Sequence, residues 1–175
     1  MLLIHNDIIT DQRHSNKERT VGERSSANTI LRGQIGKERL YNDAFANRSD
    51  VILWDVLSVE GGEKLKVVFE RKNSEWEQGV WIMCDMGVTV DDQTGKSVYL
   101  WFERSSPSGV IVQCHTENRL LSIYNVWDRG RGVESQSASS GMLVEELDNG
   151  RRYYCNDIGF ETQFNKLIFR IEYLT

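Results

Sequence analysis

The sequence predicts an all-β, antiparallel fold. About ten short segments either alternate apolar and polar residues or are continuously apolar, and turn-forming residues separate them at intervals of roughly 8–15 residues. No segment shows the 3.6-residue apolar period of an amphipathic helix. Strands of this kind are expected to form a two-sheet sandwich of jelly-roll type, and a closed β-barrel is the alternative.

The expected strands begin after a polar N-terminal segment, residues 1–26, whose apolar start could add one edge strand. Residues 27–175 are expected to form a single β-domain, long enough to bury a substantial core. In order, strands are expected at 28–35, 51–60, 63–71, 79–86, 96–104, 109–116, 119–126, 141–147, 151–156 and 166–174.

The first half of the β-domain has clear strand patterns. Residues 51–60 are nearly all apolar, as in a strand covered on both faces. Gly61-Gly62 then predicts a two-residue hairpin turn into 63–71, which alternates strictly between apolar and charged residues. An Asp- and Gly-containing turn at 91–95 separates the next two strands.

The second half starts at the strand 109–116, which follows the only proline, Pro107. The strand 119–126 precedes a long polar segment. Asn149-Gly150 is the strongest local turn signal and predicts a hairpin between 141–147 and 151–156. The last strand, 166–174, again alternates apolar and charged residues.

Composition excludes several classes of function. A net charge of -5 argues against general nucleic-acid binding, which needs a basic face. A mean hydropathy of -0.47 and the lack of an apolar run near ~20 residues argue against a transmembrane helix. The N-terminus lacks the features of a signal peptide, so a cytoplasmic protein is expected. Nothing in the sequence indicates the oligomeric state.

The three cysteines, Cys84, Cys114 and Cys155, each lie in an expected strand, and Cys84 and Cys114 are expected to be small core residues. Their odd number argues against a disulfide framework. Each has a polar neighbour, but adjacent residues of a strand point to opposite faces, and no zinc-type spacing of Cys or His occurs. We therefore predict no metal site and no cofactor. His115 is not accompanied by a nucleophile-elbow pattern, so no catalytic residue is predicted.

The long polar segment, residues 127–140, is the candidate ligand site. Its candidate ligand-binding residues, with their strand neighbours, are Tyr124, Asn125, Trp127, Asp128, Arg129 and Arg131. An exposed tryptophan can stack on the C–H face of a sugar while planar polar groups bind its hydroxyls. The two arginines, spaced by glycines, could instead clamp an anionic group together with backbone N–H groups.

Each feature of this segment also has a structural explanation. Trp127 could plug the open end of the fold, and both arginines could pair with Glu134, Glu145 and Glu146. The expected function is a non-enzymatic binding module for a carbohydrate or another polar or anionic small molecule. The alternative is a protein–protein interaction role, for example in an immunity-type accessory protein, and a hydrolase-type enzyme is third.

Overall fold

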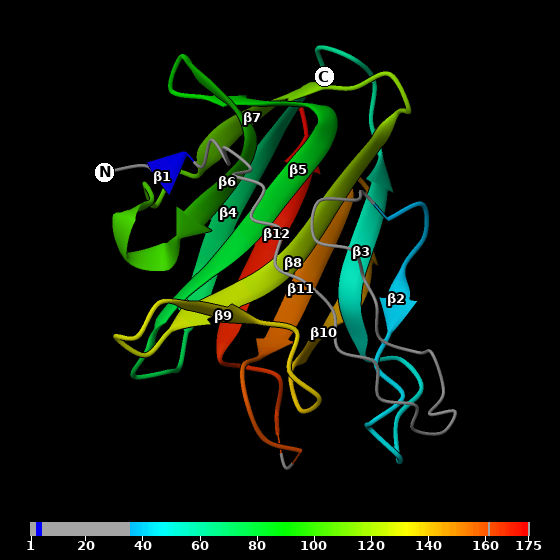
Figure 1. Ribbon diagram of the computed structural model, residues 1–175, viewed down its shortest axis with the longest axis vertical. Coiled ribbons are helices and arrows are strands. Elements are labelled where there is room, and N and C mark those ends of the chain that lie inside the picture. Colours follow the sequence, from blue (N-terminus) through cyan, green and yellow to red (C-terminus); the bar gives the residue numbers. More distant parts are fainter. Residues whose placement is uncertain (1–2, 5–35, 161, 175) are drawn as a thin grey trace, which may run out of the picture.

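The structure is a computed structural model and describes residues 3–4, 36–160 and 162–174 (Figure 1). It is all-β, as predicted, apart from one short 3-10 turn in the described part, η1 (Phe102–Arg104). The expected strand 28–35 and most of the segment 1–26 lie outside the described residues. The strands are β1 (Leu3–Ile4), β2 (Leu40–Tyr41), β3 (Ile52–Ser58), β4 (Lys64–Lys72), β5 (Glu77–Val90), β6 (Gln93–Trp101), β7 (Val110–His115), β8 (Leu120–Asp128), β9 (Val133–Ser135), β10 (Gly141–Leu147), β11 (Gly150–Asn156) and β12 (Leu167–Tyr173).

Eight of these strands close into an antiparallel barrel. The pairings run from β5 through β7, β4, β12, β11, β10, β3 and β8, and β8 pairs with β5 again. The closed barrel, stated above as the alternative, is therefore the observed arrangement, and the sandwich of jelly-roll type is not confirmed. β6 and β1 extend the sheet from the free edge of β5, while β2 pairs with β3 and β9 with β8.

The long strand β5 explains why the ring closes. Its first part, Glu77–Cys84, pairs with β8, and its last part, Gly87–Thr89, pairs with β7. The register shifts between these parts, and Gly87 has a positive φ of 106°. The sequence predicts a strand that ends at residue 86, because Gly87 interrupts the apolar alternation. The bend at Gly87 instead lets β5 pair with β8 before the bend and with β7 after it, which closes the ring.

One of the two expected hairpins forms. β10 and β11 pair along their full length around the turn before Gly150, which confirms the Asn149-Gly150 hairpin. The hairpin predicted at Gly61-Gly62 is wrong, because β3 and β4 lie on opposite sides of the ring. The chain does turn there, but the N–H of Gly62 bonds to the carbonyl of Cys114, so the connection crosses the end of the barrel. A turn signal alone does not show which strands it joins.

The barrel is filled by side chains, as expected for eight strands. Its inward-facing residues alternate along the strands with outward-facing ones. They include Cys84 and Cys114, as predicted, and also Cys155. A hydrogen bond with Cys114, together with burial, raises the pKa of the Cys84 thiol, and burial raises the pKa of Cys155. Members of the core include Ile52, Leu65, Val80, Ile82, Val112, Leu121, Ile123, Met142, Tyr153 and Phe169.

Several connections meet at one end of the barrel, at the bottom of Figure 1. They are the segments that follow β4, β8, β9 and β11. This end of the barrel, called the lower end below, holds the candidate site. No helix formed by the described residues is long and apolar enough to cross a membrane.

Candidate functional site

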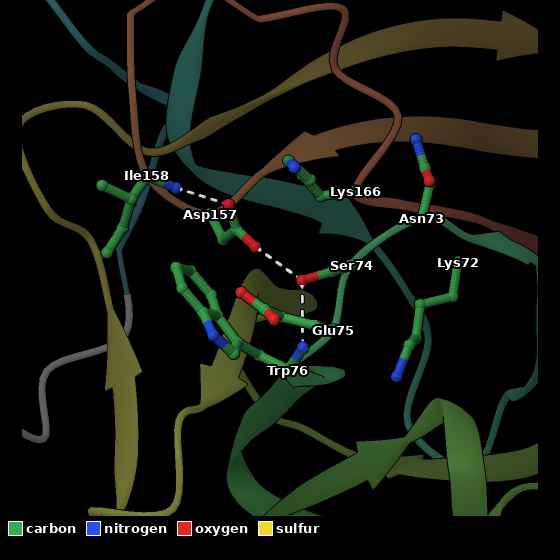
Figure 2. A pocket seen from close by; sticks show the side chains of 8 residues that line it. All are labelled: Lys72, Asn73, Ser74, Glu75, Trp76, Asp157, Ile158 and Lys166. Carbon is green, nitrogen blue, oxygen red and sulfur yellow. Dashed lines mark hydrogen bonds between the residues drawn. The ribbon is translucent and has the colours of Figure 1, made fainter.

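A cavity of about 430 Å³ opens at the lower end of the barrel. Two connections line it, one from β4 to β5 and one from β11 to β12. Its lining residues are Lys72, Asn73, Ser74, Glu75, Trp76, Asp157, Ile158 and Lys166 (Figure 2). We call this cavity the end pocket. Its volume falls in the range of small-molecule sites, roughly 300–1,000 Å³.

A buried carboxylate lies at the floor of the end pocket. Asp157 is 1% exposed, and its Oδ2 accepts hydrogen bonds from Ser74 Oγ (3.0 Å) and Gln78 Nε2 (3.0 Å). Its Oδ1 accepts a hydrogen bond from the backbone N–H of Ile158 (2.7 Å). Figure 2 shows this carboxylate directed at Ser74, with the Trp76 indole below it in that view. The hydrogen bonds fix the carboxylate in one orientation.

An aromatic wall stands beside this carboxylate. The Trp76 ring is half-buried, and its backbone N–H bonds to Ser74 Oγ at 3.3 Å. The guanidinium carbon of Arg129 lies over the ring, 5.3 Å from its centroid. Glu134 holds Arg129 in a two-point ion pair of 2.7 and 2.6 Å, which raises the pKa of Arg129 and lowers that of Glu134. Trp76 therefore has a fixed orientation before any ligand arrives.

The structure separates the six predicted site residues. Trp127 is 1% exposed and Asn125 is 2% exposed, both on the inward face of β8. Trp127 therefore lacks the exposure that stacking on a sugar needs, and it follows the structural alternative, because the inward register of β8 places its ring inside the end of the barrel. Asn125 donates a hydrogen bond to the carbonyl of Asn156 at 3.0 Å. These two side chains support the pocket wall and do not line the cavity.

Asp128 and Arg131 lie in the β8–β9 turn. Asp128 Oδ1 accepts hydrogen bonds from three successive backbone N–H groups, those of Gly130, Arg131 and Gly132, at 2.6–3.1 Å. Because these N–H groups are already bonded, the glycine-containing turn is not free to bind an anion as envisaged from the sequence. The Arg131 guanidinium has no ion pair with any described residue. Of the two arginines, only Arg129 follows the alternative prediction of pairing with Glu134.

Tyr124 lies on the outer face of the barrel, away from the end pocket. Its ring stacks on that of Trp81 at 4.6 Å and lies 5.2 Å from that of Trp54. The period of two along β8 puts it on the face opposite Asn125. The sequence placed both residues in one site because they are neighbours in the chain, and the pleat separates them.

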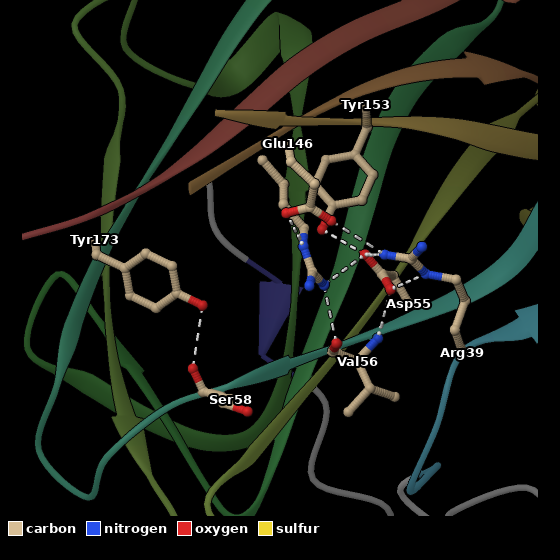
Figure 3. A network of polar contacts seen from close by, with 8 residues as sticks. Arg39, Asp55, Val56, Ser58, Glu146, Tyr153 and Tyr173 are labelled. Atoms are coloured by element: carbon tan, nitrogen blue, oxygen red, sulfur yellow. Dashed lines mark hydrogen bonds and ion pairs between the residues drawn. The ribbon is translucent and has the colours of Figure 1, made fainter. Parts of the chain in front are cut away.

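A second polar cluster lies toward the other end of the barrel, around Asp55 (Figure 3). Asp55 is fully buried and bonds to Arg39 (2.7 Å), Arg151 (3.1 Å) and the hydroxyl of Tyr153 (2.8 Å). Its own strand neighbour, Val56, donates a backbone N–H at 3.0 Å. Every oxygen of this carboxylate is therefore engaged, and two guanidinium groups balance its charge. We interpret the cluster as a structural clamp that attaches the segment before β2 to the barrel.

A second hollow, of about 310 Å³, lies beside the segment that joins β11 to β12. The ring of Phe45 packs there against those of Phe160 and Phe164, with centroids 5.2 and 5.6 Å apart. Phe160 is 55% exposed. The hollow is more apolar than the end pocket and has no buried charge among its described lining residues.

Among the described residues, no group of three or more His, Cys, Asp or Glu side chains is arranged to hold a metal ion. His115 bonds to Thr89 Oγ1 at 2.7 Å and lies outside both cavities. Neither a protein-family model nor a curated protein matches this sequence.

Ser74, Trp76 and Asp157 are not among the candidate site residues predicted from the sequence. Trp76 follows a polar break after a strand, and Asp157 ends another strand, so each carries a weak signal. What brings them together is the barrel topology, since β4 and β11 both end at the lower rim. That topology could not be predicted from strand patterns.

Proposed function

We propose that this protein is a small, non-enzymatic, cytoplasmic binding module for a carbohydrate or a similar polar small molecule. One observation carries the proposal: the fixed indole of Trp76 stands beside the buried carboxylate of Asp157 in an open cavity of about 430 Å³. In this proposal the ligand lies beside the predicted segment 127–140, and Arg129 supports the site without contacting the ligand directly.

The chemistry of the end pocket suits a polyhydroxylated ligand. An indole face packs against the C–H groups of a sugar ring, and carboxylate and amide groups at the ring edge bind its hydroxyls. Trp76 supplies the face, while Asp157, Asn73 and Lys166 supply polar groups of both hydrogen-bonding types. The restraint of Trp76 by Arg129 lowers the entropy lost on binding.

Binding is favoured over catalysis because the one hydroxyl at the pocket floor is already used. Ser74 Oγ donates to Asp157 and accepts from Gln78 Nε2 and from the N–H of Trp76. A nucleophilic serine needs a base that can take its proton, usually a histidine held nearby. The cytoplasmic assignment is supported by three free, buried cysteines, which are common in a reducing compartment.

Intrinsic tryptophan fluorescence tests the proposal. A panel of monosaccharides should change the emission of the wild-type protein, and Trp76→Phe should abolish the response. Trp101→Phe is the matched control, because Trp101 also has an arginine over its ring, Arg104 at 5.7 Å, but lies outside the end pocket. A response that survives Trp76→Phe and disappears with Trp101→Phe would contradict the proposal.

The second candidate function is binding of another protein, and the hollow formed by Phe45, Phe160 and Phe164 favours it. The exposed ring of Phe160, which packs on the buried ring of Phe45, offers a contact for an apolar side chain of a partner. Phe160→Ser should abolish such an interaction without changing any response to sugars. A protein partner whose affinity is unchanged by Phe160→Ser would remove this candidate.

A further inference from the structure

The structure contains two fully buried aspartates among the described residues, and their surroundings differ sharply. Asp55 is balanced by two guanidinium groups, those of Arg39 and Arg151. Asp157 is as deeply buried, yet all three of its hydrogen-bond donors are neutral: a hydroxyl, an amide and a backbone N–H. No Lys, Arg or His nitrogen in the described part of the chain forms an ion pair with it.

The cations near the end pocket do not supply the missing charge. Lys72 is paired with Glu103, and Arg129 is paired with Glu134 while it covers Trp76. The negative charge of Asp157 does contribute to the raised pKa of Arg129, but the two side chains form no ion pair. Lys166 lines the pocket without an ion pair to any described residue. Burial of a carboxylate is costly unless a cation accompanies it.

The pocket floor also has an excess of hydrogen-bond acceptors. Gln78 is fully buried and donates to both Ser74 and Asp157, but its Oε1 has no hydrogen-bond partner among the described residues. Gln78 does not line the cavity, so the acceptor that a donor-rich group in the end pocket would satisfy is the carboxylate of Asp157. An ammonium group carries three donors and no acceptor.

We propose that the ligand of the end pocket carries an ammonium group, which pairs with Asp157 while the rest of the ligand packs against Trp76. The inference rests on the proposed function and narrows its ligand to an amine-bearing polar molecule, such as an amino sugar. Trp76 adds to this preference, because the face of an indole attracts a cation. Asp157 is 1% exposed but is one of the residues that line the open cavity, so the ammonium group approaches its carboxylate from the cavity side.

The test compares glucose, glucosamine and N-acetylglucosamine on the wild-type protein by isothermal titration at about pH 6, where the free amine is protonated. These sugars share one ring, but only glucosamine carries a cation. Glucosamine should bind about tenfold more tightly than glucose, because a charge-assisted hydrogen bond replaces a neutral one. N-acetylglucosamine, which is neutral, should bind no more tightly than glucose.

A variant locates the effect. Asp157→Asn should reduce the preference for glucosamine to about twofold or less, whereas Asp148→Asn, at the opposite end of the barrel, should leave it unchanged. Circular dichroism shows whether each variant is folded. If Asp157→Asn does not fold, the affinities of the wild-type protein for the three sugars still test the preference for an ammonium group. Equal affinities for glucose and glucosamine would overturn this inference and leave the proposed function standing. The absence of binding to all three sugars would overturn both.

Discussion

The buried aspartate Asp55 offers the sharpest test of how the barrel is stabilised. Its carboxylate is fully buried and accepts hydrogen bonds from Arg39, Arg151, Tyr153 and the N–H of Val56 (Figure 3). Asp55→Asn keeps the shape of the side chain but removes its charge and replaces one acceptor oxygen with a donor. Both guanidinium groups then lose their buried partner, and one of their donors faces the new amide. The carboxylate that remains beside them is that of Glu146, 3.6 Å from Arg39 and 2.9 Å from Arg151.

The size of the effect follows from burial. Removal of one partner from a buried ion pair costs about 3–5 kcal/mol, because the other charge stays desolvated. The side chains of Arg39 and Arg151 are 28% and 24% exposed, so water recovers part of their solvation. Arg151 also keeps its contact with Glu146 at 2.9 Å. We therefore expect the lower end of the range, a loss of about 3 kcal/mol in the free energy of unfolding.

The assay is equilibrium unfolding in urea at pH 7, and a matched substitution controls it. Asp50→Asn removes the same charge from an Arg–Asp pair, that of Arg48 and Asp50 at 2.6 Å, but this pair lies on the surface. Exposed pairs contribute about 0–1 kcal/mol, so Asp50→Asn should be nearly neutral. If the two variants lose the same free energy within about 0.5 kcal/mol, the argument from burial is refuted.

Three further predictions concern the same barrel. Burial, with a contribution from Asp55, raises the pKa of Tyr153 well above 10.0 in the folded protein, so this phenol ionises first in the unfolded state. The contribution of the neutral Tyr153 to the free energy of unfolding is therefore full below about pH 10 and is lost as the pH rises further. Between pH 8 and 11, the free energy of unfolding in urea should therefore fall more steeply with pH for the wild type than for Tyr153→Phe. Parallel plots of this free energy against pH would argue against the burial of this phenol. Gly150→Ala should lower the free energy of unfolding by at least about 3 kcal/mol, and Gly62→Ala by only about 1 kcal/mol, as measured by thermal or urea unfolding. Both glycines have a positive φ, but only the new Cβ at Gly150 meets a backbone oxygen, that of Ile171 at 1.9 Å. Equal costs would show that the backbone shifts freely there. Cys84, Cys114 and Cys155 should not react with a thiol reagent until the protein is unfolded, because all three are buried. In addition, the hydrogen bond with Cys114 and burial raise the pKa of Cys84, and burial raises the pKa of Cys155. Fast labelling of the native protein would mean that the barrel opens.

Much of the fold was predictable because strand patterns are local. The strand at 141–147 matches β10, and the other strands expected beyond residue 50 fall on observed ones, usually within one to three residues at each end. Closure of the barrel was not predictable from these patterns, since inward-facing apolar residues suit a sandwich and a barrel equally. It depends on β5, which continues through the bend at Gly87 and pairs with β8 and then with β7.

The candidate site shows the limit of local reasoning more clearly. The segment 127–140 does adjoin the end pocket, and Arg129 contacts its aromatic wall. Trp127, however, lies inside the barrel, and the backbone N–H groups after Asp128 are bonded within their own turn. The residues that line the cavity, above all Trp76 and Asp157, are about 80 residues apart in the chain. Only the pairing of the strands between them brings them together.

The most direct test of the central claim is an amide and indole NMR titration of the full chain with glucosamine, with residue assignments. The account predicts that the indole N–H of Trp76 and the backbone amide of Ile158, which bonds to Asp157, shift together as the sugar is added. The indole signals of Trp54 and Trp81, on the outer face of the barrel, should stay in place. Shifts confined to the outer face or to the end of the barrel near Asp148, with Trp76 and Ile158 unchanged, would contradict the assignment of the end pocket as the binding site.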